Sequence, residues 1–248
     1  MSEPEAIPAA TVIVMRECAG GPPELLMVER ARAMAFAGGA LVFPGGRIDP
    51  GDRALAALHP GDPDDLAARI AAVRETLEEA GVAVGLEVAG DAIPELRRRL
   101  YAGEPMGALI EEVGATLRLD ALVPFSRWLP HNVVHRVFDT RFYLARPPEG
   151  AAPVVDGNEN VRVFWSSAQA VLDAADAGEV TIIFPTRRNL ERLALFGSFE
   201  DAVFDAAQHE IRTVTPWIET REDGDYLCIP DDLGYPVTGE RLDRAIRA

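Results

Sequence analysis

Residues 64–80 carry the strongest local pattern in this chain, and the pattern is that of one amphipathic helix. Apolar side chains recur at the three- and four-residue intervals that define one helical face: Leu66, Ile70, Val73 and Leu77. Acidic residues crowd the first turn, and Gly81 follows the last turn at the position of a helix C-cap. Strand patterns lie before and after this helix without strict βαβ alternation, which indicates an α+β or mixed-sheet sandwich.

Three carboxylates share one face of this helix. Glu75, Glu78 and Glu79 stand at positions i, i+3 and i+4. Like charges at that spacing destabilise a helix by about 0.2–0.5 kcal/mol per pair, so their repulsion should be offset by something else. A hard divalent cation, which takes oxygen ligands, would offset it. The alternative interpretation is a solvated acidic face, with Arg74 as a charge on the helix surface.

A glycine pair precedes the loop that leads to this helix. Residues 42–49 read VFPGGRID, with the pair at Gly45 and Gly46. Glycines let the backbone approach a ligand or metal closely and offer a carbonyl without obstruction by a side chain. The alternative is a plain tight turn.

Together these segments resemble the Nudix box of the Nudix hydrolases, G-x5-E-x7-R-E-U-x-E-E-x-G-U, in which U is aliphatic. Gly46 fills the first glycine of that box. The second half is filled in order by Arg74, Glu75, Glu78, Glu79, Gly81 and Val82. The match is specific over residues 74–82 and looser in the flanking segments.

The chain departs from the box at three places. The acid after Gly46 is Asp52 and not glutamate, which leaves its role open. Thr76 occupies an aliphatic position. Twenty-one residues, 53–73, stand where the box has seven, so the box contains an insertion. The helix register is intact after the insertion, and we therefore expect a preserved metal site.

The resemblance implies an α+β Nudix fold, in which a mixed β-sheet is sandwiched between α-helices. We expect a single domain over residues 1–248, with the Nudix box at 46–82, an inserted loop at about 53–63, a helical insertion at about 91–117 and a C-terminal extension at about 186–248. The turn residues of 49–63 predict a long loop, and residues 82–88 predict a strand. Two helices broken near Gly197 and a hairpin about Gly224 are expected in the extension.

The resemblance also implies hydrolysis of a pyrophosphate bond in a nucleoside diphosphate linked to another group. Mg²⁺ or Mn²⁺ would neutralise the pyrophosphate and activate water. We assign Glu75, Glu78 and Glu79 as metal ligands, with the Gly46 carbonyl as an additional one. Arg74 is expected to pair with a carboxylate of the box and hold its orientation.

The general base and the substrate contacts are less constrained. Glu159, in a loop before a predicted strand, is our candidate for the general base or for an extra metal ligand. Glu75 or Glu78 could serve as the base instead. The alternative interpretation of Glu159 is a purely structural one, in which this loop acid caps a turn. Arg30 and Arg32 are candidates for phosphate contacts, although each would equally suit a solvated surface. Phe36 is a candidate for stacking on a base, with core packing as its alternative.

Inserted boxes of this kind resemble one subgroup, the coenzyme A-cleaving Nudix hydrolases related to the mammalian peroxisomal enzymes. Residues 29–36, residues 136–145 and the FPT of residues 184–186 are similar to segments of that subgroup. The resemblance implies coenzyme A or acyl-CoA as the substrate. The alternatives are a pyrophosphatase for ADP-ribose, NADH or a dinucleoside polyphosphate, and a non-catalytic Nudix module that senses a nucleotide.

The composition excludes other classes of partner. The formal net charge is −16, and such an acidic chain gains no general attraction to nucleic-acid backbones or anionic lipids. No apolar run approaches the roughly 18–20 residues that span a bilayer, and the first residues lack the pattern of a signal peptide. We therefore expect a cytoplasmic enzyme with a small nucleotide substrate, no nucleic-acid partner and no membrane partner. A homodimer stays open.

Overall fold

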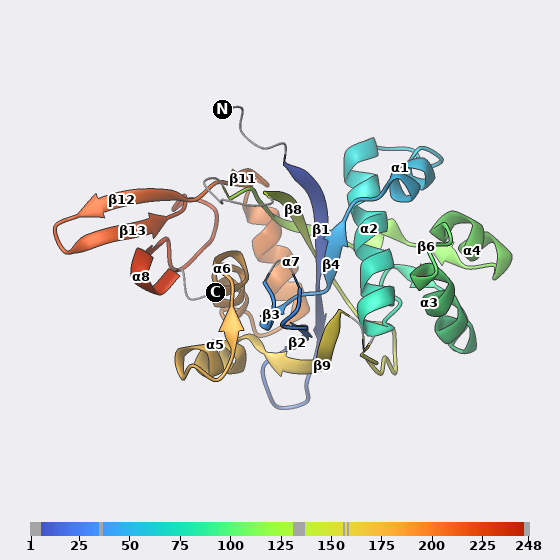
Figure 1. Cartoon of the computed structure of the whole chain (residues 1–248), viewed down its shortest axis with the longest axis horizontal. Coiled ribbons are helices and arrows are strands. Elements are labelled where there is room, and N and C mark those ends of the chain that lie inside the picture. Colours follow the sequence, from blue (N-terminus) through green and yellow to red (C-terminus); the bar gives the residue numbers. More distant parts are fainter. Residues whose placement is uncertain (1–5, 35–36, 131–136, 156, 158, 246–248) are drawn as a thin grey trace.

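The structure is a computed structural model that describes residues 6–34, 37–130, 137–155, 157 and 159–245. These residues form a mixed sheet with helices on both faces, as the sequence predicts (Figure 1). Its strands are β1 (Ile7–Arg16), β2 (Glu24–Arg30), β3 (Ala40–Val42), β4 (Gly45–Arg47), β7 (Val123–Trp128), β8 (Phe138–Ala145), β9 (Asn160–Ser167), β10 (Thr181–Ile182) and β11 (Thr213–Val214). None of the helices in this described part of the chain is long and apolar enough to cross a membrane.

Strand β1 is the centre of the sheet. The strand order is β10-β3-β2-β1-β8-β7-β11, with β4 paired to β1 and β9 paired to β2. β1 runs parallel to β8 and antiparallel to β4, in a register that places Ala10 opposite Gly46 and Thr11 opposite Gly45. This pairing fixes the glycine pair on the sheet, next to the helix of residues 63–80.

The predicted amphipathic helix is α2 (Pro63–Ala80), which covers one face of the sheet. The Asp62 side chain caps its start by accepting a hydrogen bond from the Asp64 amide, and Gly81 ends it in the left-handed conformation with a φ of 67°. Its buried side chains, such as Ile70 and Val73, pack in one core with residues of β1 and β2. The expected helix is confirmed, with a start one residue earlier.

The expected loop at 49–63, including the inserted loop at 53–63, is partly wrong, because residues 50–56 form the helix α1 (Pro50–Ala56). Asp49 and Asp52 form a capping box at its start, and the Asp52 carboxylate accepts from the Asp49 amide at 2.8 Å. Leu55 and Ala56 are buried in the α2 core. The density of turn residues concealed both the cap and this buried pair.

The helical insertion lies on the outer side of α2, at the right of Figure 1. It consists of the 3-10 helix η1 (Gly90–Ala92), α3 (Ile93–Tyr101) and α4 (Met106–Glu112), flanked by the short paired strands β5 (Leu86–Glu87) and β6 (Thr116–Leu117). The break between the two α-helices falls at residues 102–105, as expected. The expected strand at 82–88 is reduced to β5, because Gly85 adopts a left-handed φ of 60° and turns the chain.

The other face of the sheet is covered by helices from the C-terminal third of the chain. They are α5 (Ala168–Asp176), α6 (Phe184–Leu193) and α7 (Phe199–Gln208). The second core, between these helices and the sheet, includes residues as late as Leu233 and Tyr235. Residues 186–235 are therefore integral to the sandwich and are not an appended extension.

The last segment forms a small sheet that projects to the left in Figure 1. Its strands are β12 (Trp217–Arg221), β13 (Gly224–Cys228) and β14 (Gly239–Arg241), followed by α8 (Leu242–Ala245). The expected hairpin about Gly224 is confirmed in β12 and β13.

A matched pair of substitutions tests whether α6 belongs to the core. Leu190, a residue of α6, is fully buried, whereas Leu195, just after the helix, is largely exposed. We expect Leu190→Ala to lower the free energy of unfolding by about 2–5 kcal/mol, because it removes buried methyl groups and leaves a cavity. Leu195→Ala should change it by less than about 0.5 kcal/mol. Urea unfolding measures both, and equal small losses would contradict the integral role of α6.

Candidate active site

The site is built where α2 lies against the glycine strand β4. The Gly45 amide donates a hydrogen bond to Glu79 Oε2 at 3.0 Å. Gly46 approaches Glu75 so closely that a Cβ at this position would overlap the Glu75 carboxylate. The glycine pair therefore lets two carboxylates of α2 reach the backbone of the strand, and any larger residue at position 46 would displace one of them.

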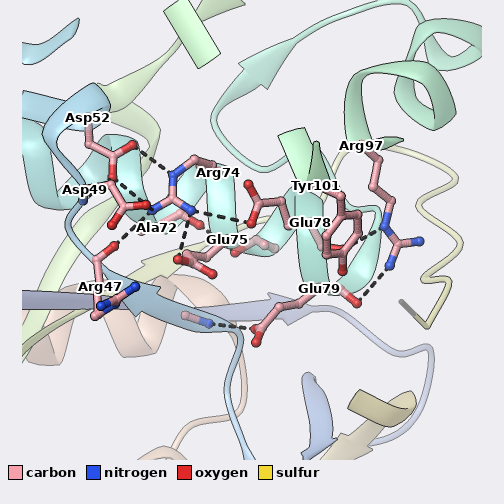
Figure 2. A network of polar contacts seen from close by, with 12 residues as sticks. Arg47, Asp49, Asp52, Ala72, Arg74, Glu75, Glu78, Glu79, Arg97 and Tyr101 are labelled. Carbon is pink, nitrogen blue, oxygen red and sulfur yellow. Dashed lines mark hydrogen bonds and ion pairs between the residues drawn. The ribbon is translucent and has the colours of Figure 1, made fainter. Parts of the chain in front are cut away.

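Arg74 is the centre of a buried polar network (Figure 2). Its Nε and Nη2 donate to the two carboxylate oxygens of Asp52 at 3.0 and 2.9 Å, and its Nη1 donates to Glu75 Oε1 at 2.9 Å. Nη2 also donates to the carbonyl of Arg47 at 3.0 Å, next to the glycine pair. Arg74 thus pairs with a box carboxylate, as the sequence predicts, and is not a surface charge.

Two departures from the box have structural explanations. Asp52 is almost fully buried and uses both oxygens on Arg74, so it joins α1 to α2. Thr76 is fully buried, and its hydroxyl donates a hydrogen bond to the Ala72 carbonyl at 2.7 Å. The buried hydroxyl therefore has a partner, and threonine fits at this aliphatic position of the box. Neither departure disturbs the face that carries the three glutamates.

The three glutamates lie in an environment that disfavours their charge. Burial raises the pKa of Glu75 to about 7 and that of Glu79 to about 8, and it also raises the pKa of Glu78. Arg74 lowers the pKa of Glu75 and Glu78, but it also serves Asp52. Arg30 Nη1 lies 3.9 Å from Glu79 Oε1. The two guanidinium groups of Arg74 and Arg30 therefore face four carboxylates, and negative charge exceeds positive charge at this site. The four carboxylates are those of Asp52, Glu75, Glu78 and Glu79.

The chemistry of this set fits a hard divalent cation. Mg²⁺ and Mn²⁺ take oxygen ligands, and a doubly charged ion would compensate the excess of carboxylates. Among the described residues no three acidic, histidine or cysteine side chains converge closely enough to hold an ion in this structure. The reason is visible in the contacts, because Arg74 holds Glu75 and the Gly45 amide holds Glu79 at separate points.

The structure separates the candidate substrate residues. Arg30 lies in β2 beside Glu79, at the edge of the site. Arg32 is exposed and lines a cavity of about 590 Å³ between the sheet and α5, together with Glu29 and Phe164. Arg32 is therefore not brought to the acidic face of α2. Phe36 lies outside the described residues.

Glu159 is exposed immediately before β9, and its backbone carbonyl accepts a hydrogen bond from the Ala31 amide at 2.8 Å. This bond places the segment beside Arg30. The structure thus brings Glu159 to the strand edge that borders the site, and its role as a base stays a prediction.

Three residues that bear on the site are missed by the sequence patterns. Asn160 is buried in β9, and its side-chain hydrogen bond stabilises the charged form of Glu79. Arg97 and Tyr101 of α3 donate hydrogen bonds to backbone carbonyls at the end of α2. Arg97 and Tyr101 stand four residues apart beside the apolar positions Leu96 and Leu100, and this spacing was the one local signal for them.

Comparisons with known proteins agree with the geometry. No protein-family model matches the chain. The acyl-coenzyme A diphosphatase NUDT19 of Gallus gallus is 26% identical, over 88% of this chain and 75% of that protein, and its Homo sapiens counterpart is 28% identical over 88% and 74%. A solved NUDIX hydrolase from Alicyclobacillus acidocaldarius superposes with a TM-score of 0.72 and 28% identity, over 81% of this chain and 96% of that chain. The chain is similar to Nudix hydrolases in both sequence and fold.

The chain has the α+β Nudix fold that the box implies, and the expectation of a pyrophosphohydrolase is confirmed. The similarity extends over most of the chain, far beyond the box.

The raised pKa values make a prediction about the metal-free enzyme. The folded state retains protons on Glu75 and Glu79 up to pH values of about 7 and 8, whereas the unfolded chain releases them near 4.5. Because the folded state binds more protons in this interval, the free energy of unfolding should fall as the pH rises from 5 to about 8. Glu79→Gln, which mimics the protonated side chain, should show a smaller decline.

Thermal unfolding in EDTA across this pH range measures the difference between the two proteins. A wild-type melting temperature that does not fall relative to that of Glu79→Gln would show that the Glu79 carboxyl titrates normally.

Proposed function

We propose that this Nudix hydrolase cleaves the pyrophosphate bond of coenzyme A or acyl-CoA in a reaction that depends on Mg²⁺ or Mn²⁺. The observation that carries the proposal is the acidic face of α2, held against Gly45 and Gly46 with fewer positive than negative charges around it. The choice of substrate is supported by the two relatives named as acyl-coenzyme A diphosphatases, which align with 88% of the chain.

Glu75, Glu78 and Glu79 would hold the metal, together with the carbonyl of Gly46. When bound, such an ion supplies charge neutralisation for the pyrophosphate and a water nucleophile near neutral pH. The chain itself performs the positioning. Arg74 holds Glu75 through one nitrogen while its other two bind Asp52, so the orientation of this ligand depends on α1.

Positive charge for the substrate phosphates would come from Arg30, which stands beside Glu79 at the end of β2. Its proximity to Glu79 orders the guanidinium before substrate arrives. Arg32, which is exposed on the cavity by α5, would contact only a distal part of an extended substrate. Phe36 stays a candidate for stacking on a base.

Glu159 is our candidate for the general base. Its position immediately before β9 leaves this residue exposed, where its carboxylate can accept a proton from an approaching water. Glu75 and Glu78 remain alternatives, since each carries a carboxylate on the same face of α2.

The alternative substrates are ADP-ribose, NADH and dinucleoside polyphosphates, and the alternative of another class is a nucleotide sensor without activity. All three glutamates of the box are present, which favours an enzyme. Cytoplasmic location, a homodimer, and the absence of a nucleic-acid partner stay predictions from the sequence.

The decisive experiment incubates the purified protein and Mg²⁺ or Mn²⁺ with CoA, an acyl-CoA, ADP-ribose, NADH and a diadenosine polyphosphate. We expect cleavage of CoA or acyl-CoA to a 3′-phosphorylated adenosine monophosphate and a phosphopantetheine product, identified by chromatography. Faster cleavage of another member would move the assignment to that substrate. Binding of a nucleotide without turnover of any member would support the sensor.

Variants in the same assay test the site. Glu79→Gln should lose activity by orders of magnitude because it removes a metal ligand, and Glu159→Gln should lose about 10²–10⁴-fold if Glu159 is the base. The control is Glu87→Gln, on the exposed strand β5 in a surface pair with Arg118. Full activity of Glu79→Gln would contradict the metal assignment.

A further inference from the structure

The backbone carbonyls in the last turn of α2 need hydrogen-bond donors from outside the helix. The final four carbonyls of a helix lack partners within it, and they carry the negative end of the helix dipole. Two of these carbonyls belong to Glu78 and Glu79, whose acidic side chains are partly buried and buried, respectively. Without such donors, the turn that bears the proposed ligands would fray most readily. The negative end of the helix dipole would also repel the carboxylates of Glu78 and Glu79.

Each of these four carbonyls has a donor. The Leu77 carbonyl accepts from the Gly81 amide at 2.9 Å, and the Ala80 carbonyl accepts from the Val154 amide at 2.8 Å. The two between them are served from the helical insertion. Arg97 Nε donates to the Glu78 carbonyl at 2.7 Å, and Arg97 Nη2 donates to the Glu79 carbonyl at 3.1 Å.

Tyr101 completes the arrangement. Its hydroxyl donates to the same Glu78 carbonyl at 2.7 Å, so this carbonyl accepts from two side chains of α3. Figure 2 shows both side chains reaching from α3 to the end of α2. A Cβ at Gly81 would stand 3.5 Å from Arg97 Nη1, so the C-cap glycine also leaves room for the guanidinium.

We propose that Arg97 and Tyr101 are positioning residues for the metal ligands, an inference that rests on the proposed metal-dependent function. They bind the backbone of the two residues whose side chains would hold the ion, and one guanidinium bridges both carbonyls. A fork with two donors fixes the relative position of two consecutive peptide groups, which a single ammonium group cannot do. The helical insertion thereby acts on the site through the backbone of α2, without contacting the substrate.

The charge of Arg97 has a second effect. It places a cation at the negative end of the α2 dipole, in the turn that holds Glu78 and Glu79, and so lowers the electrostatic cost of keeping both carboxylates ionised for a metal. A residue that only stabilised the fold would not change the affinity of the folded protein for a divalent ion. Affinity for Mn²⁺ therefore separates the two roles.

The experiment measures Mn²⁺ binding to the full-length protein by the electron paramagnetic resonance signal of free Mn²⁺, at a temperature where each variant is folded by circular dichroism. We expect Arg97→Ala to weaken Mn²⁺ binding by about 10–100-fold, the usual effect of losing a residue that orients metal ligands. Arg97→Lys should recover only part of the affinity. Tyr101→Phe should weaken binding less than Arg97→Ala, because Arg97 still serves the Glu78 carbonyl.

The matched control is Arg98→Ala, the next residue on α3, which is exposed and pairs with Glu95 on the surface. It should bind Mn²⁺ as the wild type does. Wild-type affinity in a folded Arg97→Ala protein overturns the proposal. If that variant does not fold, wild-type affinity in Tyr101→Phe overturns it. If the wild type itself binds no Mn²⁺, the proposed metal-dependent function fails, and the positioning role fails with it.

Discussion

The close approach of α2 to β4 is the interaction on which the rest of the site depends. A helix normally keeps its distance from a neighbouring strand because side chains fill the space between them. Here Gly45 and Gly46 supply none, so the Glu79 carboxylate reaches the Gly45 amide and the Glu75 carboxylate lies against Gly46. The approach is possible because β4 pairs antiparallel with β1, which fixes the glycines at the height of the last two turns of α2.

That approach creates an electrostatic imbalance which the surrounding elements only partly correct. Arg74 is shared between Asp52 and Glu75, and Arg30 approaches Glu79 without a close hydrogen bond. Burial, reinforced by the neighbouring carboxylates, raises the pKa values of Glu75 and Glu79, and keeping these side chains ionised costs stability in the metal-free protein. Strongly shifted pKa values of this kind are typical of functional sites. The insertions contribute to the correction: α1 supplies Asp52, and α3 supplies the donors for the end of α2.

Much of this arrangement could be predicted from the sequence, and the part that could not is set by contacts between distant segments. The helix at 64–80, its three glutamates and the glycine pair are local patterns, so their placement followed from spacing alone. The partner of Asp52 could not be predicted, because Arg74 lies beyond the insertion and only the fold brings the two together. Asn160 reaches Glu79 through the register of β9 on β2, in which it stands opposite Arg30. The position of α6 in the core could not be predicted, because the sequence pattern of a helix does not indicate which face of the sheet it covers.

The Mn²⁺ affinity of Gly46→Ala, measured beside that of Gly51→Ala, tests the role of the close approach most directly. Gly51 lies in α1 with open space where the methyl group of an alanine would stand, so its substitution controls for the general effect of an added Cβ. The added methyl group at position 46 must displace the Glu75 carboxylate, which is flexible enough to move without unfolding the protein. We expect Gly46→Ala to bind Mn²⁺ at least about ten-fold more weakly than Gly51→Ala, with similar melting temperatures. Equal affinities in the two folded variants would contradict the view that the glycine strand positions the metal ligands.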